Sequence, residues 1–188
     1  MRKLIAAAAL VTAAVALVSG TAAAAPVPVP APAPARAEYL SLRSWTLLNE
    51  HGPGANPGER LTARVDARTV GGRTRGHAVV QHEFIGEGTV RVEFDVDCLT
   101  TGHGAVTVTG LVTTATATPV GGRPPTTGPA GWHPETGLTF YPADEHGERR
   151  VGWAGADLSD PGKPSRATMC TPVPADLWVI GGRTVVRR

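Results

Sequence analysis

The stretch Val90-Arg-Val-Glu-Phe-Asp-Val-Asp-Cys98 decides the fold of this chain, because its side chains alternate without interruption between apolar and charged. The apolar positions are Val90, Val92, Phe94, Val96 and Cys98. The charged positions between them are Arg91, Glu93, Asp95 and Asp97. Successive side chains of a β-strand point to opposite faces, so the pattern predicts a strand with one buried and one solvated face.

Similar patterns lie on both sides of this strand. Every second residue is apolar from Leu61 to Ala67, and a second strand is predicted from Gly76 to Ile85, after a turn at Gly71-Gly72. On the C-terminal side, Thr100 to Gly104 is a hairpin-type loop, and Ala105 to Thr114 alternates Val and Thr as a partner strand. The centre of the chain is therefore predicted to be consecutive antiparallel strands.

The remaining segments extend the all-β pattern. Glu38 to Leu48 fits neither a short helix nor a strand well. Strands are predicted at Gly137 to Tyr141 and Arg149 to Ala154, and long loops at Pro119 to Pro134 and Asp157 to Pro174. The last elements, Leu177 to Ile180, Gly181-Gly182 and Arg183 to Val186, resemble a hairpin with a two-residue glycine turn.

The fold class follows from these strands and from the turn residues. Pro and Gly, at 17 and 23 of 188 residues, form about a fifth of the chain and favour turns over long helices. About seven short strands predict a small antiparallel β-barrel, with a β-sandwich as the alternative. We favour the barrel because closure removes exposed sheet edges. This single β domain is predicted to span residues 38–188.

The first 24 residues are predicted to be a secretory signal peptide. Arg2 and Lys3 precede an apolar run from Leu4 to Val18, and Ala22-Ala23-Ala24 provides small residues for cleavage after Ala24. The run is too short for a comfortable membrane span, although an uncleaved signal anchor is the alternative. The chain is therefore expected to be secreted and extracellular.

A proline-rich linker, residues 25–37, follows the signal peptide. Pro alternates with small residues from Pro26 to Pro34, which favours extended polyproline II and excludes a helix. The segment is either a stalk or a disordered leader of biased composition. No cysteine follows the signal and no sorting motif ends the chain, so no stable membrane anchor is expected after cleavage.

The net charge of +2 belongs to the signal peptide. Without Arg2 and Lys3, 16 of the 18 basic residues remain against 16 acidic ones, so the mature chain is neutral. The sequence also has no run of Lys or Arg longer than a pair. These properties are not those of a nucleic-acid binder, and no nucleic-acid partner is expected.

The chain has two cysteines, Cys98 and Cys170, in the exported region. Disulfides persist outside the cell, so we predict that the two are bonded, with Cys98 on the inward face of its strand. The alternative is a nucleophilic thiol, which needs an electropositive setting. Asp95 and Asp97 beside Cys98 disfavour a thiolate.

Four segments together resemble a family of uncharacterised secreted actinobacterial proteins, sometimes labelled repetin-like. They are Val92 to Leu99, Ala105 to Val112, Arg150-Val-Gly-Trp153 and Cys170-Thr-Pro-Val-Pro174, within a resemblance over about Leu61 to Val186. The resemblance implies a small β domain with its first Cys before a Gly-containing turn and its second before a Pro. The loop Pro119 to Pro134 departs from the family. No activity is known for it, so no catalytic residue is carried over.

Known catalytic and metal-binding patterns are absent from the sequence. His77 and His82 are five residues apart, which places them on opposite faces of a strand. The other four histidines lie in predicted loops: His51, His103, His133 and His146. There is no HExxH, paired Cys-x-x-Cys or Gly-x-Ser-x-Gly, and the segment Asp157 to Gly162 is predicted to be a capped turn. No catalytic, cofactor-binding or metal-binding residue is predicted, and no cofactor.

Two features remain as candidate sites. Glu93, Asp95 and Asp97 line one strand face, where paired carboxylates can hydrolyse glycosides or bind Ca²⁺, although a solvated outer face is the simpler interpretation. Trp132, in a loop between Gly131 and His133, is a candidate ligand contact for sugar stacking. Trp153 is assigned to the core.

The sequence favours a secreted, non-enzymatic β domain with an extracellular binding or structural role. The alternative is a carbohydrate-binding module or a carboxylate-dependent hydrolase that uses Trp132 or the carboxylates at 93–97. The partner is unknown, and cell-wall or other extracellular polysaccharide is the candidate class. The two hypotheses differ in whether the carboxylates line a concavity or point into water.

Overall fold

A computed structural model describes residues 39–52 and 58–188. The predicted signal peptide, residues 1–24, and linker, residues 25–37, lie outside the described residues. The described chain is all β, without a helix, so it contains no helix that could cross a membrane. Its strands are β1 (Leu40–Asn49), β2 (Glu59–Val70), β3 (Arg73–Phe84), β4 (Gly88–Gly102), β5 (Ala105–Pro119), β6 (Thr126–Thr127), β7 (Glu135–Phe140), β8 (Arg150–Ala154) and β9 (Leu177–Arg187).

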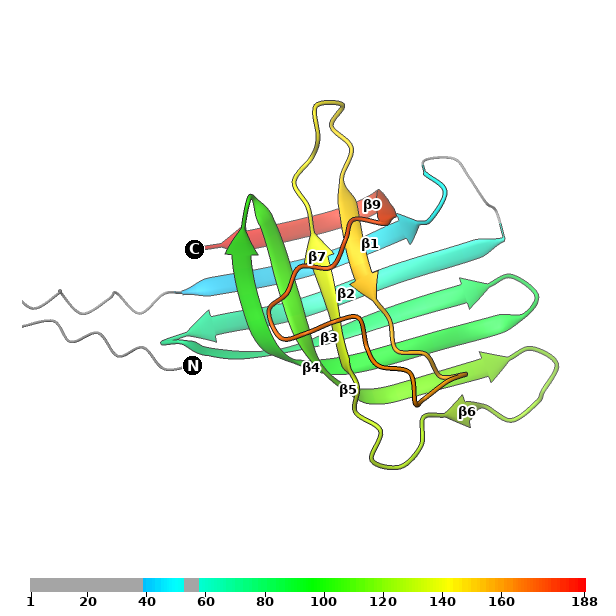
Figure 1. The fold of residues 1–188 in the computed structure, drawn as a ribbon. Helices are drawn as coiled ribbons and strands as arrows, with labels where there is room; N and C mark the ends of the chain where they lie inside the picture. The colour runs from blue at the N-terminus through cyan, green and yellow to red at the C-terminus, as the bar shows by residue number, and fades with distance from the viewer. Residues whose placement is uncertain (1–38, 53–57) are drawn as a thin grey trace, which may run out of the picture. The chain divides into compact units, whose positions relative to one another are not determined.

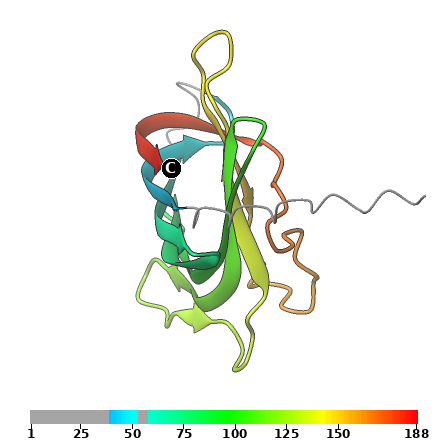
Figure 2. The same cartoon turned by 90° about the vertical axis from the view of Figure 1, so that its left-hand side faces the viewer.

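Eight of these strands form a closed antiparallel barrel (Figures 1 and 2). Their order is β4-β3-β2-β1-β9-β8-β7-β5, and pairing of β4 with β5 closes the circle. The short strand β6 pairs with the end of β5 outside this circle. The predicted barrel is confirmed, and the sandwich alternative is wrong because β4 and β5 continue from one wall into the other.

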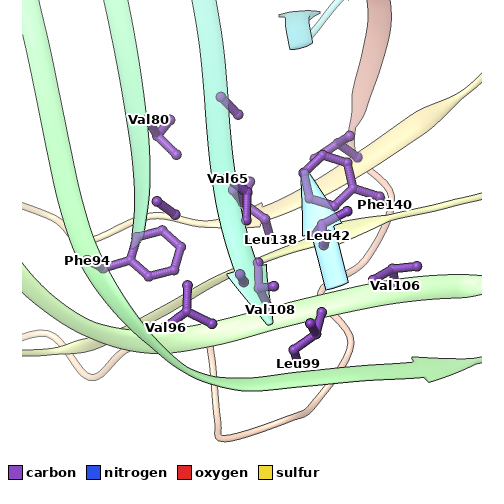
Figure 3. Packing of buried hydrophobic residues seen from close by; sticks show 14 of the residues in the cluster. Leu42, Val65, Val80, Phe94, Val96, Leu99, Val106, Val108, Leu138 and Phe140 are labelled. Atoms are coloured by element: carbon purple, nitrogen blue, oxygen red, sulfur yellow. The ribbon is translucent and has the colours of Figure 1, made fainter. Parts of the chain in front are cut away.

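The interior of the barrel is filled by apolar side chains at alternate positions of the strands (Figure 3). Leu61, Ala63, Val65 and Ala67 of β2 are all buried, as the two-residue period predicts. The largest fully buried side chain is Phe94 of β4, in the same cluster as Val108 of β5 and Leu138 of β7. The inward faces of opposite walls therefore share one core.

A β-bulge at Asp97 reverses the alternation of β4. Val96 pairs with Gly110, but Cys98 already pairs with Thr109, so Leu99 joins the core in its place. Cys98 is therefore on the outer side of the barrel, and its predicted inward position is wrong. A side chain at Gly110 would overlap the backbone oxygen of Asp95, so glycine allows the two strands to approach at this bend.

The structure also revises three predicted segments of the chain. Residues 40–49 form a strand, β1, which resolves the choice between helix and strand. Thr126–Thr127 adds a short strand inside the predicted loop 119–134. The predicted C-terminal hairpin is wrong: Gly181-Gly182 lies within the continuous strand β9, opposite a register shift between Leu47 and Leu48. Ile180 is the unpaired residue at this shift, and Gly182, two residues further on, has φ of 98°, a conformation that glycine adopts readily within a strand as well as in a turn.

Residues 155–176, which we name the strap, cross the outer side of β7 and β8 (Figure 2). The predicted disulfide is present between Cys98 and Cys170, whose Cα atoms are 5.6 Å apart, and it attaches the strap to β4. Tyr141 Oη donates a hydrogen bond to Val173 O (2.6 Å). Gly152 lies directly under Val173 and Pro174, where a Cβ would overlap their carbonyl oxygens.

Candidate functional site

One end of the barrel opens into a cavity of about 920 Å³, which we name the mouth cavity. It lies where β1 and β8 end and where β4 and β9 begin, and the strap forms one side. Its apolar wall consists of Val90, Trp132, Trp153, Ala156, Leu158 and Leu177. Its polar residues include Glu50, Asp157, Ser159, Lys163, Arg166 and Asp176. The volume and mixed lining are those of a small-molecule site.

Trp132, the predicted ligand contact, lies in the wall of this cavity. Its ring is half-buried and packs with Val92, Val112 and Ala115, which form a second apolar cluster at this end of the barrel. The indole Nε1–H donates to the carbonyl of Pro161 in the strap (2.9 Å). These contacts hold the ring in a defined orientation at the cavity.

Trp153 of β8 lies between the barrel core and the mouth cavity. Its side chain packs against both apolar clusters, in line with its assignment to the core, and it also lines the cavity. Its Nε1–H is the buried side-chain polar atom without a hydrogen-bond partner in the described part of the chain. A buried donor of this kind is normally paired, so Trp153 lacks a hydrogen bond that most buried polar groups make.

Asp157 places a carboxylate at the edge of the mouth cavity. Its Oδ1 accepts hydrogen bonds from Ser159 Oγ (2.6 Å) and Ser159 N (3.0 Å), and Lys163 Nζ lies 3.4 Å from Oδ2. The hydroxyl bond, then the backbone bond and Lys163 hold the pKa of Asp157 below its usual value. The predicted capped turn is confirmed by the two hydrogen bonds from Ser159.

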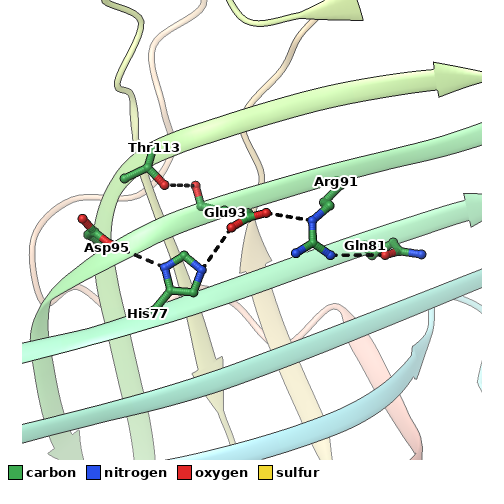
Figure 4. A network of polar contacts seen from close by, with 6 residues as sticks. All are labelled: His77, Gln81, Arg91, Glu93, Asp95 and Thr113. Atoms are coloured by element: carbon green, nitrogen blue, oxygen red, sulfur yellow. Dashed lines mark hydrogen bonds and ion pairs between the residues drawn. The ribbon is translucent and has the colours of Figure 1, made fainter. Parts of the chain in front are cut away.

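The carboxylates at 93–97 do not line the mouth cavity. Glu93 and Asp95 lie on the outer wall on either side of His77, with Glu93 Oε2 3.2 Å from Nε2 and Asp95 Oδ1 3.4 Å from Nδ1 (Figure 4). Arg91 Nε donates to Glu93 (2.8 Å) and, as the main cause, lowers the pKa of Glu93. Asp97 is in the bulge and outside this network.

This network has the properties of a solvated polar surface. Because the two carboxylates contact opposite edges of the His77 ring, they do not converge on one point. Across residues 39–52 and 58–188, no three His, Cys, Asp or Glu side chains gather in a way that could hold a metal ion. The lowered pKa of Glu93 also disfavours the protonated form that a general acid needs.

The histidines lie as the strand and loop patterns predict. His77 is on the outer wall, whereas His82 is turned to the other face and its Nε2 lies 3.1 Å from Glu59 Oε2. His82 also stacks on Phe84 with ring centroids 3.9 Å apart. The four loop histidines are exposed: His51, His103, His133 and His146.

The sequence did not indicate most of the mouth cavity. Trp132 was the one member that its loop position singled out, whereas Glu50, Asp157 and Asp176 come from three segments that are distant in sequence. These three residues are marked only by their positions just beyond the ends of strands. The order of the strands in the barrel is needed to know which strand ends lie on the same rim.

The fold and the cavity define a closed antiparallel β-barrel with a strapped outer wall and one ligand-sized mouth. Comparisons with protein-family models, with curated proteins and with solved structures found no match. The resemblance to secreted actinobacterial proteins therefore stays a prediction.

Proposed function

We propose that this protein is a secreted extracellular binding domain that holds a saccharide in its mouth cavity. The observation that carries the proposal is the cavity of about 920 Å³ with Trp132 and Trp153 in its wall. Membership of the secreted actinobacterial family is part of the same proposal. The disulfide supports the extracellular location, because such bonds persist in oxidising compartments.

The chemistry of the wall suits a sugar ring. An indole face packs against the C–H groups of a pyranose, and the Trp132 ring is already held in place by its bond to Pro161. Glu50, Asp157 and Asp176 offer carboxylate oxygens that accept hydrogen bonds from hydroxyl groups.

Binding without hydrolysis is the role we favour for this chain. A glycosidase needs two carboxylates on either side of a bound substrate, one of them protonated. Glu93 and Asp95 instead lie on the open outer wall in contact with His77, and the pKa of Glu93 is lowered. The mouth carboxylate Asp157 also has a lowered pKa.

The test is a titration of the secreted chain with a panel of neutral hexasaccharides, followed by calorimetry and tryptophan fluorescence. Trp153→Phe keeps an aromatic ring but reduces the flat surface of the wall, and we expect affinity to fall about two- to threefold. Trp132→Ala removes the stacking surface and should cost about tenfold or more. Trp178→Phe is the matched control, because Trp178 packs under Arg150 and does not line the cavity. Unchanged affinity in both mouth variants, or no binding across the panel, would contradict the proposal.

A further inference from the structure

The outer wall formed by β9, β1, β2, β3 and β4 carries a concentration of arginines, which we name the arginine face. Its members are Arg43, Arg60, Arg64, Arg68, Arg75, Arg91, Arg183 and Arg187. The acidic side chains on the same wall are Asp66, Glu83, Glu93 and Asp95. The mature chain is neutral, so folding separates its charge and leaves this wall with an excess of cations.

Most of these arginines lack a carboxylate partner. Arg43 Nε lies 3.2 Å from Asp66, and Arg91 Nε lies 2.8 Å from Glu93. Within the described residues, the other six arginines of the face form no ion pair. Guanidinium groups cannot lose their charge at physiological pH, so these six cations are available to an external anion.

Trp45 of β1 lies on this wall and is 41% exposed. In the strand register it is directly opposite Arg183 of β9 on one side and Arg64 of β2 on the other. Adjacent strands are about 4.8 Å apart, so two guanidinium groups flank one exposed indole. Two surface hollows adjoin this row, one of about 410 Å³ with Trp45, Arg60, Arg64 and Arg91, and one of about 630 Å³ with Arg68 and Arg183 among its residues.

We propose that the arginine face binds an acidic polysaccharide. Arginine binds carboxylates through two parallel N–H···O bonds, and a uronate polymer presents carboxylates at regular intervals along a stiff chain. Trp45 supplies a flat apolar surface for one sugar ring between the charged contacts. Single-stranded nucleic-acid sites instead align aromatic side chains on which successive bases stack, whereas the exposed rings here are Trp45 in the first hollow and Tyr39 in the second, about 20 Å apart along an extended chain.

This site is separate from the mouth cavity, with which its two hollows share no lining residue. Its chemistry also differs, because charge rather than stacking provides most of the attraction. The proposal therefore does not rest on the proposed function, and either can fail alone.

The experiment measures retardation of the secreted chain in gels that contain polygalacturonate, with dextran as the neutral control polymer. We expect binding to polygalacturonate alone, and weaker binding as the salt concentration rises. Arg64→Gln combined with Arg183→Gln should weaken binding about fivefold, and Trp45→Ala by a similar factor. Arg123→Gln is the matched control, since this exposed arginine lies in the loop after β5, outside the face.

Three results would overturn the proposal. The first is equal retardation by dextran and polygalacturonate, and the second is equal loss of binding in the Arg123→Gln control and in the double variant. The third is tighter binding of single-stranded DNA than of polygalacturonate in a competition assay, which would assign the face to nucleic acid. Far-UV circular dichroism and a thermal melt establish that each variant is folded, and a neutral hexasaccharide titration of Trp45→Ala should leave the mouth site unchanged.

Discussion

Replacing both cysteines, Cys98→Ala together with Cys170→Ala, should remove a large part of the stability of the barrel. The bond joins residues 72 apart in sequence. In the chain-entropy model, removing a crosslink that closes a loop of that size lowers the free energy of unfolding by about 4 kcal/mol. The free energy of unfolding of a domain of this size is roughly 5–15 kcal/mol in total, so losing the disulfide would remove a substantial fraction of it.

The bond also determines how the strap is held. Without it, the nearby attachments include the hydrogen bonds from Cys170 N to Thr109 Oγ1 (3.0 Å), from Val173 N to Thr139 Oγ1 (2.9 Å) and from Tyr141 Oη to Val173 O (2.6 Å). Each such bond contributes only about 0.5–1.5 kcal/mol net. We therefore expect the strap of the variant to open locally and to be cut by protease faster than the strands.

The assay is equilibrium unfolding in urea, followed by tryptophan fluorescence and far-UV circular dichroism. For a slope near 2 kcal/mol/M, the midpoint should fall by about 2 M. Wild-type protein with reductant should approach the variant, and the variant itself should not respond to reductant. A change below about 1 kcal/mol would refute the entropic reasoning, because the loop term by itself is about 4 kcal/mol.

Three further perturbations have defined outcomes. Gly152→Ala forces a methyl group against the strap carbonyls and should cost about 1–3 kcal/mol in urea unfolding, whereas Gly102→Ala, which meets no atom within 4 Å, should change stability little. Burial, then the charge of Asp176, raises the pKa of Tyr141, so its contribution is complete below the ordinary value of 10.0 and is lost as pH rises through the folded-state pKa. Tyr141→Phe should abolish that alkaline dependence and cost about 1 kcal/mol through its bond to Val173, as pH-dependent melts would show. Phe94→Ala should cost about 3–5 kcal/mol, since the ring is fully buried, and a loss under 1 kcal/mol in urea would contradict its place in the core.

The strands were predictable where local alternation alone determines them. The periods in β2 and in β4 up to Val96 required no knowledge of the partners, because a strand has the same two faces whatever it pairs with. The errors at Cys98 and Gly181-Gly182 occur at bulges. A bulge depends on the register of a partner strand, and the glycine pair beside Ile180 has the same sequence signature as a turn.

The candidate sites, like the strands, were predictable only where the pattern is local in sequence. Trp132 could be named from its loop, but its orientation depends on Pro161, 29 residues further along the chain. The three carboxylates at 93–97 were visible as a solvated face, yet only the neighbouring strand β3 supplies His77. Neither the mouth cavity nor the arginine face corresponds to one continuous stretch of sequence.

The fold class, the pairing of the two cysteines and the buried side chains of most strands could be predicted from the residues alone, because these follow from local periodicity and composition. Tertiary structure alone decided that the barrel closes through β4 and β5, which strand ends share one mouth, and that arginines from β9, β1, β2, β3 and β4 lie on one wall. The physical reason is that alternation specifies a face for each strand separately. Neighbours on that face come from the order and register of the strands, which depend on contacts between residues distant in sequence.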